Sequence, residues 1–536
     1  MPASVIAIGL DALDPRVLEK WLDEDKLPFL TRLAREGTYA RQRNFSLYRT
    51  ENSWLTLLQG CAPETSHEWG HQNYDAGNYA LNERAAYEFR LFPPFYALDG
   101  KPRVAAFDVP LTRLVPGVNG VQLLGWGTEV NQILRESSPP GLMAELIGRH
   151  GRHPLYDTIT NADDGSETLS YRIPCLYDIE VMRSVRDKLV SAAGQRTAII
   201  GELLDSDNWD LLFCTYGEIH TAGHQFWHIG RDHPLREAFF DQAGSDFMLD
   251  ILQEIDRNLA ALLADVPDDT TIVIFSPHGM QANSIDLYSM VFLPELIYRW
   301  STGTAAFKGL EENGEPSPLR FDYSRHWSEE IWDLRTPHGD AVLESPEVQD
   351  SRGDPLYWDP GNWYRSAWPG MRAFVLPGYS EGLIRINVAG RDGDAGIPPE
   401  QFDATCNELT ELVCQMVDAR TGKQMAQEIV RVRQSPWEDG ADLSPADLMV
   451  LWNDELATDV VSHPRFGQIG PVPFFRTGGH ATEGFVLARG PGFDRGRKMP
   501  AVETADVTAT LLDRLGVDLP DHIDGSPIGR APSLAG

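Results

Sequence analysis

The chain has 536 residues, more than one hydrophobic core usually supports, so the sequence predicts a large core with an insertion or a second domain. It carries 46 basic and 79 acidic residues, and the resulting formal charge of −33 disfavours nucleic acid or an anionic membrane as a partner. A hydrophobic content of 42% with 14 tryptophans excludes a disordered chain.

The cysteines and the first residues of the sequence also indicate what kind of protein this is. The five cysteines are scattered without a CxxC spacing, which is typical of buried thiols rather than of a disulfide framework. The opening residues MPASVIAIGL have the pattern of a first strand rather than of an exported leader. No apolar run reaches the roughly 18 residues of a membrane span. We therefore expect a cytoplasmic protein without a membrane span.

The first 280 residues alternate between apolar runs and segments of helical period. Buried strands that alternate with helices are typical of βαβ units, so we expect an α/β fold with a parallel sheet. In chain order the pattern predicts a strand (5–13), a helix (15–37), an extended segment (38–48), a helix from Glu51 to Gly60, strands (103–110 and 120–127), a helix (181–193), a strand (209–218), a helix (246–266) and a strand (270–280).

The pattern changes after about residue 290. Residues 301–370 are rich in Gly, Pro, Trp and charge and have no regular period. We interpret residues 291–440 as a cap inserted between the two parts of a catalytic core, residues 1–290 and 441–536. Strands at ADLMVLWND and EGFVLARGPGF and a final helix at TADVTATLLDRLGV are expected to complete that core.

Single polar residues follow or flank these apolar runs. An open α/β sheet gathers its active site at the ends of its strands. A carboxylate, a hydroxyl and several imidazoles together indicate a hydrolytic centre of the zinc or manganese type. The candidate residues are Asp11, Thr50, His220, His224, His278 and His480.

Two interpretations of Thr50 stay open from its own segment. The threonine precedes the helix expected to begin at Glu51. A hydroxyl at a helix N-terminus lies among free backbone N–H groups and the positive end of the helix dipole, which favours an alkoxide and a bound tetrahedral anion. The alternative is an ordinary threonine N-cap with a structural role only.

The histidines in GEIHTAGHQFWH are spaced to share one face of a helix. His220 and His224 are four residues apart, as are His224 and His228. The neighbouring Glu218 is either a metal ligand, a carboxylate that orients an imidazole, or a solvated side chain. His278 stands at a strand end before a glycine, which leaves its ring open to a cleft.

Five segments carry a shared pattern: VIAIGLDALDPRVL, TENSWLTLLQG with Thr50 ten residues before Gly60, HTAGH, SPHGM and GGHATEGFVLARGPG. Together they resemble the alkaline phosphatase superfamily and, within it, the type I phosphodiesterase/nucleotide pyrophosphatase-like predicted phosphohydrolases. HTAGH resembles the D-x-x-G-H segment of that family, and SPHGM resembles its S-D-H-G-M segment. The resemblance covers nearly the whole chain. It implies an alkaline phosphatase-like fold, with a mostly parallel central sheet flanked by helices and an inserted cap region.

The resemblance also implies a reaction and its metal ions. We expect metal-dependent hydrolysis of a small organic phosphate ester or phosphodiester through a phospho-threonine intermediate. Two divalent ions, zinc or manganese, flank the nucleophile in such a mechanism. Carried over residue by residue, Asp11, Thr50 and His278 fall at one ion, and His224 and His480 fall at the other.

Two positions depart from the family pattern. His220 and Pro277 stand where the family commonly has aspartates, so one ion exchanges a carboxylate for a neutral imidazole and the other loses a carboxylate. The less negative cluster either accommodates a more highly charged substrate or holds a single ion. Glu218 and Asp14 are the candidates to replace the missing carboxylates.

Two other functions remain as alternatives. One is a transferase that uses the same site to pass a phosphoryl or sulfuryl group to an acceptor other than water, behind a cap that excludes water. The other is a non-catalytic member of the fold. A sulfatase of the formylglycine type is disfavoured, because its C-x-P-S-R-like motif is absent from TENSW. In either catalytic case the expected partner is a small phosphate or sulfate ester.

Overall fold

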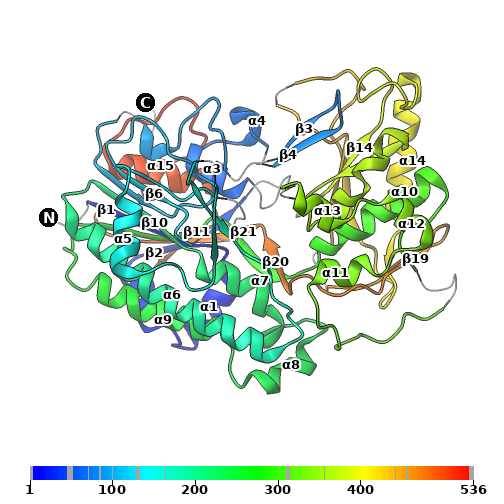
Figure 1. The fold of residues 1–536 in the computed structure, drawn as a ribbon. Coiled ribbons are helices and arrows are strands. Elements are labelled where there is room, and N and C mark those ends of the chain that lie inside the picture. Colours follow the sequence, from blue (N-terminus) through cyan, green and yellow to red (C-terminus); the bar gives the residue numbers. More distant parts are fainter. Residues whose placement is uncertain are drawn as a thin grey trace.

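The computed structural model describes residues 4–44, 52–69, 72–83, 86–98, 100–127, 133–162, 164–309, 314–354, 356–378, 380–440, 442–453 and 457–529. Two lobes lie side by side, the larger around a ten-stranded sheet and the smaller around a four-stranded sheet (Figure 1). Within the described residues, no helix combines the length and the apolar character that crossing a membrane requires.

The large sheet is mostly parallel, as predicted. Five adjacent strands, β11-β1-β10-β5-β6, run in the same direction, whereas β21 and β7 run antiparallel to their neighbours β11 and β6. The strand order is β22 (Arg497–Lys498), β2 (Thr38–Arg43), β21 (Glu483–Arg489), β11 (Thr271–Ser276), β1 (Val5–Leu10), β10 (Leu211–Tyr216), β5 (Val104–Phe107), β6 (Gly120–Leu124) and β7 (Glu136–Ser138), with β23 (Val502–Glu503) beside β2.

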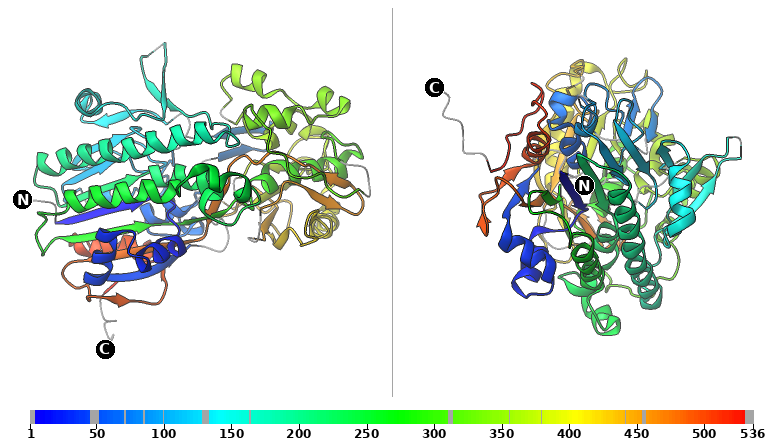
Figure 2. Two further views of the ribbon diagram at one scale, coloured as in Figure 1. Left: turned by 90° about the horizontal axis from the view of Figure 1, so that it is seen from below. Right: turned by 90° about the vertical axis from the view of Figure 1, so that its left-hand side faces the viewer.

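Helices cover both faces of this sheet (Figure 2). Alternate residues of β1 point to opposite faces, so Ile6 and Ile8 lie in one apolar core while Val5 and Ala7 lie in another. Both faces are therefore buried, which explains the continuous apolar sequence of the central strands. The first core includes α6 (Ile179–Ser206), α7 (Glu218–Gly230) and α9 (Phe247–Leu262); the second includes α3 (Ser53–Gln59) and α15 (Thr504–Arg514).

Two predicted helices differ in extent from the observed ones. The segment 15–37 forms two helices, α1 (Pro15–Asp23) and α2 (Pro28–Glu36). Pro28 has no N–H to donate to a continuing helix, so it occupies the first position of a new one. The helix predicted at 181–193 extends from Ile179 to Ser206, and Asp178 caps its start by accepting from the N–H groups of Glu180 and Val181.

The smaller lobe contains an antiparallel sheet in the order β13 (Ala373–Leu376), β14 (Gly382–Ile386), β17 (Leu448–Trp452) and β16 (Ala426–Arg431). Its helices are α10 (Leu293–Thr302), α11 (Trp327–Trp332), α12 (Pro337–Val342), α13 (Pro346–Ser351) and α14 (Phe402–Cys414). The prediction that ADLMVLWND returns to the core sheet was wrong, because β17 pairs with β14 and β16. A short apolar run indicates a buried strand but not the sheet that contains it.

The smaller lobe also holds a three-stranded sheet of β15 (Val417–Asp418), β18 (Val461–His463) and β19 (Gly467–Ile469). Because β18 and β19 still belong to a sheet of the smaller lobe, the chain returns to the larger lobe only after residue 469. The predicted boundary was at residue 441. We therefore propose that the inserted region extends from about residue 291 to the loop before residue 478.

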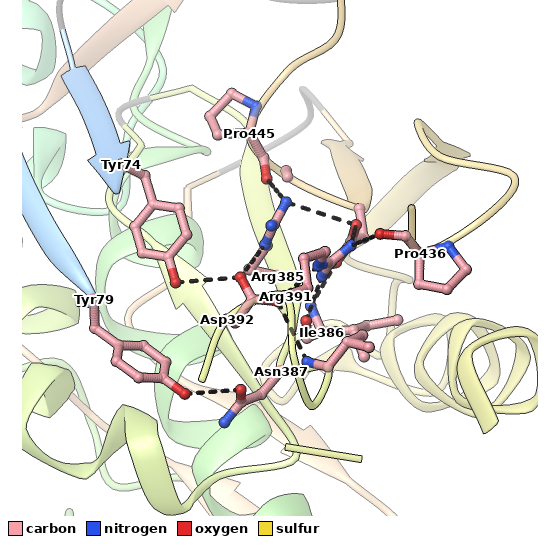
Figure 3. A network of polar contacts seen from close by, with 12 residues as sticks. Tyr74, Tyr79, Arg385, Ile386, Asn387, Arg391, Asp392, Pro436 and Pro445 are labelled. Carbon is pink, nitrogen blue, oxygen red and sulfur yellow. Dashed lines mark hydrogen bonds and ion pairs between the residues drawn. The ribbon is translucent and has the colours of Figure 1, made fainter. Parts of the chain in front are cut away.

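A hairpin from the N-terminal part of the chain joins the two lobes. The strands β3 (Gln72–Asp75) and β4 (Ala80–Glu83) lie beside the small sheet (Figures 1 and 3). Tyr79 Oη donates to Asn387 Oδ1 at 2.9 Å, and the Tyr74 ring packs against Phe374 with 5.8 Å between ring centroids. These contacts attach a segment of the N-terminal part of the chain to the smaller lobe.

Behind this hairpin lies a buried network of charges (Figure 3). Asp392 accepts from Arg385 and from Arg391, each at 2.7 Å, and Arg391 also donates to both oxygens of Asp447 at 2.9 and 2.7 Å. Both carboxylates are fully buried. Every charge in the network has an opposite charge in contact, so the polar segment around GRDGD has a structural role in the small lobe.

Candidate active site

Three parallel strands deliver polar side chains to one edge of the large sheet. Asp11 directly follows β1, His220 lies near the start of α7 after β10, and His278 lies two residues after β11. Because neighbouring parallel strands end at the same edge, these three side chains meet there.

His480 reaches the same place from the end of the chain. It lies on β20 (Gly478–Ala481), which pairs with β12 (Gly279–Ala282) so that His480 stands opposite Met280. Thr477 anchors the approach to β20, because its N–H donates to the His224 carbonyl at 2.8 Å. The short sheet therefore places His480 over the helix that carries His224.

Three imidazoles converge on one point. Nε2 of His220 lies 2.9 Å from Nε2 of His224 and 2.9 Å from Nε2 of His480, and the last two nitrogens are 3.0 Å apart. His220 and His224 are one helical turn apart on α7, as their spacing predicts. Each of these three residues offers one nitrogen as a metal ligand, and the three nitrogens lie close enough together to bind a single ion.

The partners of the other ring nitrogens assign the tautomers. Nδ1 of His224 lies 2.7 Å from the carbonyl oxygen of Gly478, and Nδ1 of His220 lies 3.0 Å from Oδ2 of Asp11. Both oxygens accept, so both Nδ1 atoms carry a hydrogen, and in a neutral ring Nε2 then presents a lone pair. When both rings are neutral, the two Nε2 atoms at 2.9 Å repel each other, and a cation bound between them removes that repulsion.

The surroundings of His224, His278 and His480 disfavour the protonated form of each ring. Burial, together with the nearby guanidinium of Arg476, moves the pKa of His224 well below its ordinary value, and burial with the neighbouring positive groups does the same for the pKa of His480. Burial lowers the pKa of His278 to about 4. Neutral imidazole is the form that binds a metal ion.

Asp11 is the carboxylate of the cluster. Burial alone would raise its pKa, but the charge and hydrogen bond of His220, the charge of His278 and the Trp54 hydrogen bond outweigh burial and lower the pKa of Asp11. Trp54 Nε1 donates to Asp11 Oδ1 at 2.8 Å, and His278 Nε2 lies 3.5 Å from the same oxygen. In this geometry the carboxylate orients the His220 ring.

Trp54 lies on α3, the helix that follows the predicted nucleophile. Thr50 itself and Glu51, where the helix was predicted to begin, lie outside the described residues. The helix spans Ser53–Gln59 and ends at Gly60, whose φ of 70° is the left-handed conformation of a glycine C-cap. The Trp54 contact therefore attaches the start of this helix to Asp11.

Two further candidates have partners outside the histidine cluster. Glu218 is buried, and its two oxygens lie 2.8 and 3.0 Å from Nε of Arg196, which also contacts Asp108 at 2.9 Å. Asp14 caps α1 and accepts from the Arg16 N–H at 2.9 Å. Both carboxylates have structural partners, so neither is positioned to replace the aspartates that the family carries at positions 220 and 277.

Sequence reasoning missed Arg476. Nη1 of this residue lies 3.0 Å from Nε2 of His224, and its Nε donates to the buried carboxylate of Asp286. The segment RTGGH was recognised for its histidine, and the spacing of four residues between Arg476 and His480 was the available signal. The contact with His224 depends on the pairing of β20 with β12, which the sequence pattern does not predict.

The three-histidine cluster fits a divalent ion that prefers imidazole. Zinc binds imidazole nitrogen at about 2.0–2.1 Å, so three ligand nitrogens around a tetrahedral ion lie roughly 3.3 Å apart. The observed separations of 2.9–3.0 Å are slightly shorter and need only small ring movements to match. A cation at this point would also remove the repulsion between the Nε2 atoms of neutral His220 and His224.

The comparison with protein families identifies the chain. The type I phosphodiesterase/nucleotide pyrophosphatase family matches residues 5–302, more than half of the sequence. The chain belongs to this family. The resemblance inferred from the sequence motifs is thereby confirmed, and membership makes the protein a phosphohydrolase. The matched residues include those from Asp11 to His278, whereas His480 lies beyond them.

The solved structures that align with this chain over most of its length have low sequence identity to it. Phosphonoacetate hydrolase from Sinorhizobium meliloti 1021 in complex with phosphonoacetate is 13% identical, with 96% of each chain covered and a TM-score of 0.49. Murine ectonucleotide pyrophosphatase/phosphodiesterase 5 is also 13% identical, with 96% of each chain covered and a TM-score of 0.46. No curated protein matches the sequence.

Proposed function

We propose that the protein hydrolyses a small organic phosphate ester or phosphodiester at a divalent ion bound by His220, His224 and His480, with Thr50 as the nucleophile. The observation that carries the proposal is the convergence of the three Nε2 atoms to within 2.9–3.0 Å of one another. Family membership supplies the reaction class, and the histidine cluster supplies a place for the ion.

Each of these residues has a separate role in the proposed reaction. His224 and His480 remain neutral and present their lone pairs, and Asp11 fixes the ring of His220 through Nδ1. When bound, a divalent ion polarises a phosphoryl oxygen and stabilises the ionised form of a hydroxyl. The Thr50 hydroxyl loses its proton and forms the bond to phosphorus as the bond to the leaving oxygen breaks, and that oxygen takes up a proton to leave as the alcohol. Water then attacks phosphorus and frees Thr50, which releases phosphate from a monoester substrate or a phosphate monoester from a diester substrate.

We further propose one firmly bound ion per chain, with zinc as its identity. A second ion would find only Asp11 and His278 among the described residues, since Pro277 has no ligand atom in its side chain. Both oxygens of Asp11 already have partners, Trp54 on Oδ1 and His220 on Oδ2. The described residues therefore offer three nitrogens to one ion and an incomplete set to another.

Elemental analysis of protein purified without chelator tests the ion. We expect one zinc per chain in the parent protein and less than a tenth of that in His480→Ala. The control is His150→Ala, which removes a partly exposed histidine that pairs with Glu202. Unchanged metal content in His480→Ala would remove this histidine from the ligand set, and two ions per chain would refute the single-ion proposal.

Acid-quenched turnover followed by mass spectrometry tests the nucleophile. The peptide that contains Thr50 should carry a phosphoryl group in the parent protein, and Thr50→Ala should lose turnover while it keeps its ion. Full activity of Thr50→Ala would exclude Thr50 as the nucleophile. Transfer of the phosphoryl group to an added alcohol in preference to water would instead indicate the transferase.

A further inference from the structure

Arg476 is a cation placed directly against the proposed ion site. Its Nη1 lies 3.0 Å from Nε2 of His224, the same nitrogen that faces His220 and His480. Its side chain is only 12% exposed. A guanidinium has no lone pair to offer a metal ion, so Arg476 is not a ligand of the cluster.

The position of the guanidinium is fixed by a buried carboxylate. Arg476 Nε donates to Asp286 Oδ2, which also accepts from Asn283 Nδ2 at 2.8 Å. Asn283 Oδ1 in turn accepts from the Asp286 N–H at 3.0 Å. Asp286 is 1% exposed, and its Oδ1 has no hydrogen-bond partner among the described residues. Asp286 therefore holds Arg476 through Nε alone and leaves the two Nη groups for another acceptor.

The charges of the site are unbalanced towards positive when an ion is present. Asp11 and Asp286 contribute two negative charges, Arg476 contributes one positive charge, and a histidine that binds a metal ion does so as the neutral imidazole. A divalent ion adds two positive charges, so one positive charge remains before substrate binds. A buried excess of positive charge favours an anionic ligand. The Coulomb attraction between the fixed guanidinium of Arg476 and a bound anion scales with the charge of that anion, so Arg476 stabilises a dianion more than a monoanion.

Ion binding also changes what Arg476 can bind. The lone pair on His224 Nε2, which now accepts from Nη1, would be used by the ion. The N–H groups on the two Nη atoms of Arg476 would then lack an acceptor among the described residues. The planar guanidinium matches two oxygens of a phosphoryl or phosphonate group, and such paired contacts are stronger than those between neutral groups.

We propose that Arg476 binds the non-bridging oxygens of the substrate and sets a preference for a dianionic phosphoryl group, as in a phosphate monoester or a phosphonate, over the monoanion of a phosphodiester. This inference rests on the proposed function for its ion and its reaction. Arg476 is the specificity-determining residue, and Asp286 is the residue that positions it.

Kinetics on two matched esters test the preference. At pH 8, where a phosphate monoester is dianionic, we expect Arg476→Ala to lower kcat/KM for 4-nitrophenyl phosphate by about 10- to 100-fold. For bis(4-nitrophenyl) phosphate the loss should be at most about threefold. Arg497→Ala, which removes an exposed arginine paired with Asp494, is the control and should change neither rate. An equal loss on both esters, or no loss on either, would overturn the proposal.

A binding measurement separates this inference from the proposed function. Calorimetric titration of the zinc-loaded protein with inorganic phosphate needs no turnover, and Arg476→Ala should weaken that binding at least tenfold while zinc content stays the same. If the parent protein hydrolyses neither ester but Arg476→Ala still loses phosphate binding, the hydrolase proposal fails and the anion site stands. Unchanged phosphate binding would refute the role of Arg476.

A second variant, Arg476→Lys, tests whether a loss of binding in Arg476→Ala is due to misfolding. Arg476→Lys keeps the positive charge but loses the planar pair of donors, so phosphate binding should fall between that of the parent protein and that of Arg476→Ala. If both variants bind phosphate as tightly as the parent does, the interaction is not made by this side chain.

Discussion

The protein buries two groups of polar side chains that differ in how completely the chain satisfies them. In the smaller lobe, Arg391 donates to Asp392 and to both oxygens of Asp447, and it also contacts the carbonyl oxygens of Ile386 and Pro436. In the larger lobe, the Nε2 atoms of three histidines face one another at 2.9–3.0 Å. In the first group every carboxylate contacts a guanidinium, whereas the second group brings three ligand nitrogens together at one point.

This difference separates a structural cluster from a functional one. Opposite charges in contact stabilise each other, whereas several neutral imidazole nitrogens that face one another are stabilised by a cation bound between them. Burial alone does not distinguish the two, since Asp392, Asp447 and His224 are all fully buried. The useful criterion is whether the polar groups that face one another are opposite in charge, as in the smaller lobe, or alike, as in the histidine cluster.

The strongest test of the contrast is Arg391→Ala. Removing the guanidinium leaves Asp392 and Asp447 buried with fewer opposite charges, and breaking a buried ion pair from one side typically costs about 3–5 kcal/mol. Urea denaturation should show a loss of that size, while zinc content per folded chain stays unchanged. The matched control, Arg497→Ala, breaks an exposed pair and should cost less than about 1 kcal/mol. Loss of zinc in folded Arg391→Ala would show that the two groups are coupled.

Zinc should stabilise the folded protein through the histidine cluster, and this stabilisation should not depend on the charge network of the smaller lobe. At a free ion concentration of about 100 times Kd, binding to the folded state alone adds about 2.7 kcal/mol to the free energy of unfolding. We expect that increment for the parent protein and for Arg391→Ala, and its absence in His480→Ala. Thermal unfolding with and without zinc measures it. An equal increment in His480→Ala would place the stabilising ion elsewhere.

A smaller effect is expected at the carboxylate that orients the cluster. Asp11→Asn keeps the size of the side chain but removes the charge that holds Nδ1 of His220. Loss of a partner that orients a metal-binding histidine typically weakens metal affinity by about 10- to 100-fold. Competition with a chelator of known affinity measures this change. Complete loss of the ion would instead make Asp11 a ligand, and unchanged affinity would remove it from the site.

The sequence pattern predicted the strands and most of the cluster, for a physical reason. β1, β10 and β11 are buried on both faces, so their apolar runs are continuous, and the first polar residues after them mark the edge of the sheet. Contacts that depend on tertiary placement were not predictable. The apolar run at β17 did not show which sheet contains it, and the pairing of Glu218 with Arg196 depends on how α6 packs. Arg476 was missed for the same reason.

The smallest predicted effect concerns the hairpin between the lobes. Tyr79→Phe removes a hydroxyl that donates to Asn387 Oδ1 and keeps the ring that packs against Phe374. One hydrogen bond of this kind contributes about 1 kcal/mol, so urea denaturation should show a loss of that order. Zinc content should not change, because the contacts of the Tyr79 side chain are with Asn387 and Phe374 in the smaller lobe. A much larger loss in Tyr79→Phe than in Arg391→Ala would mean that the attachment of the hairpin, rather than the charge network behind it, stabilises the small lobe.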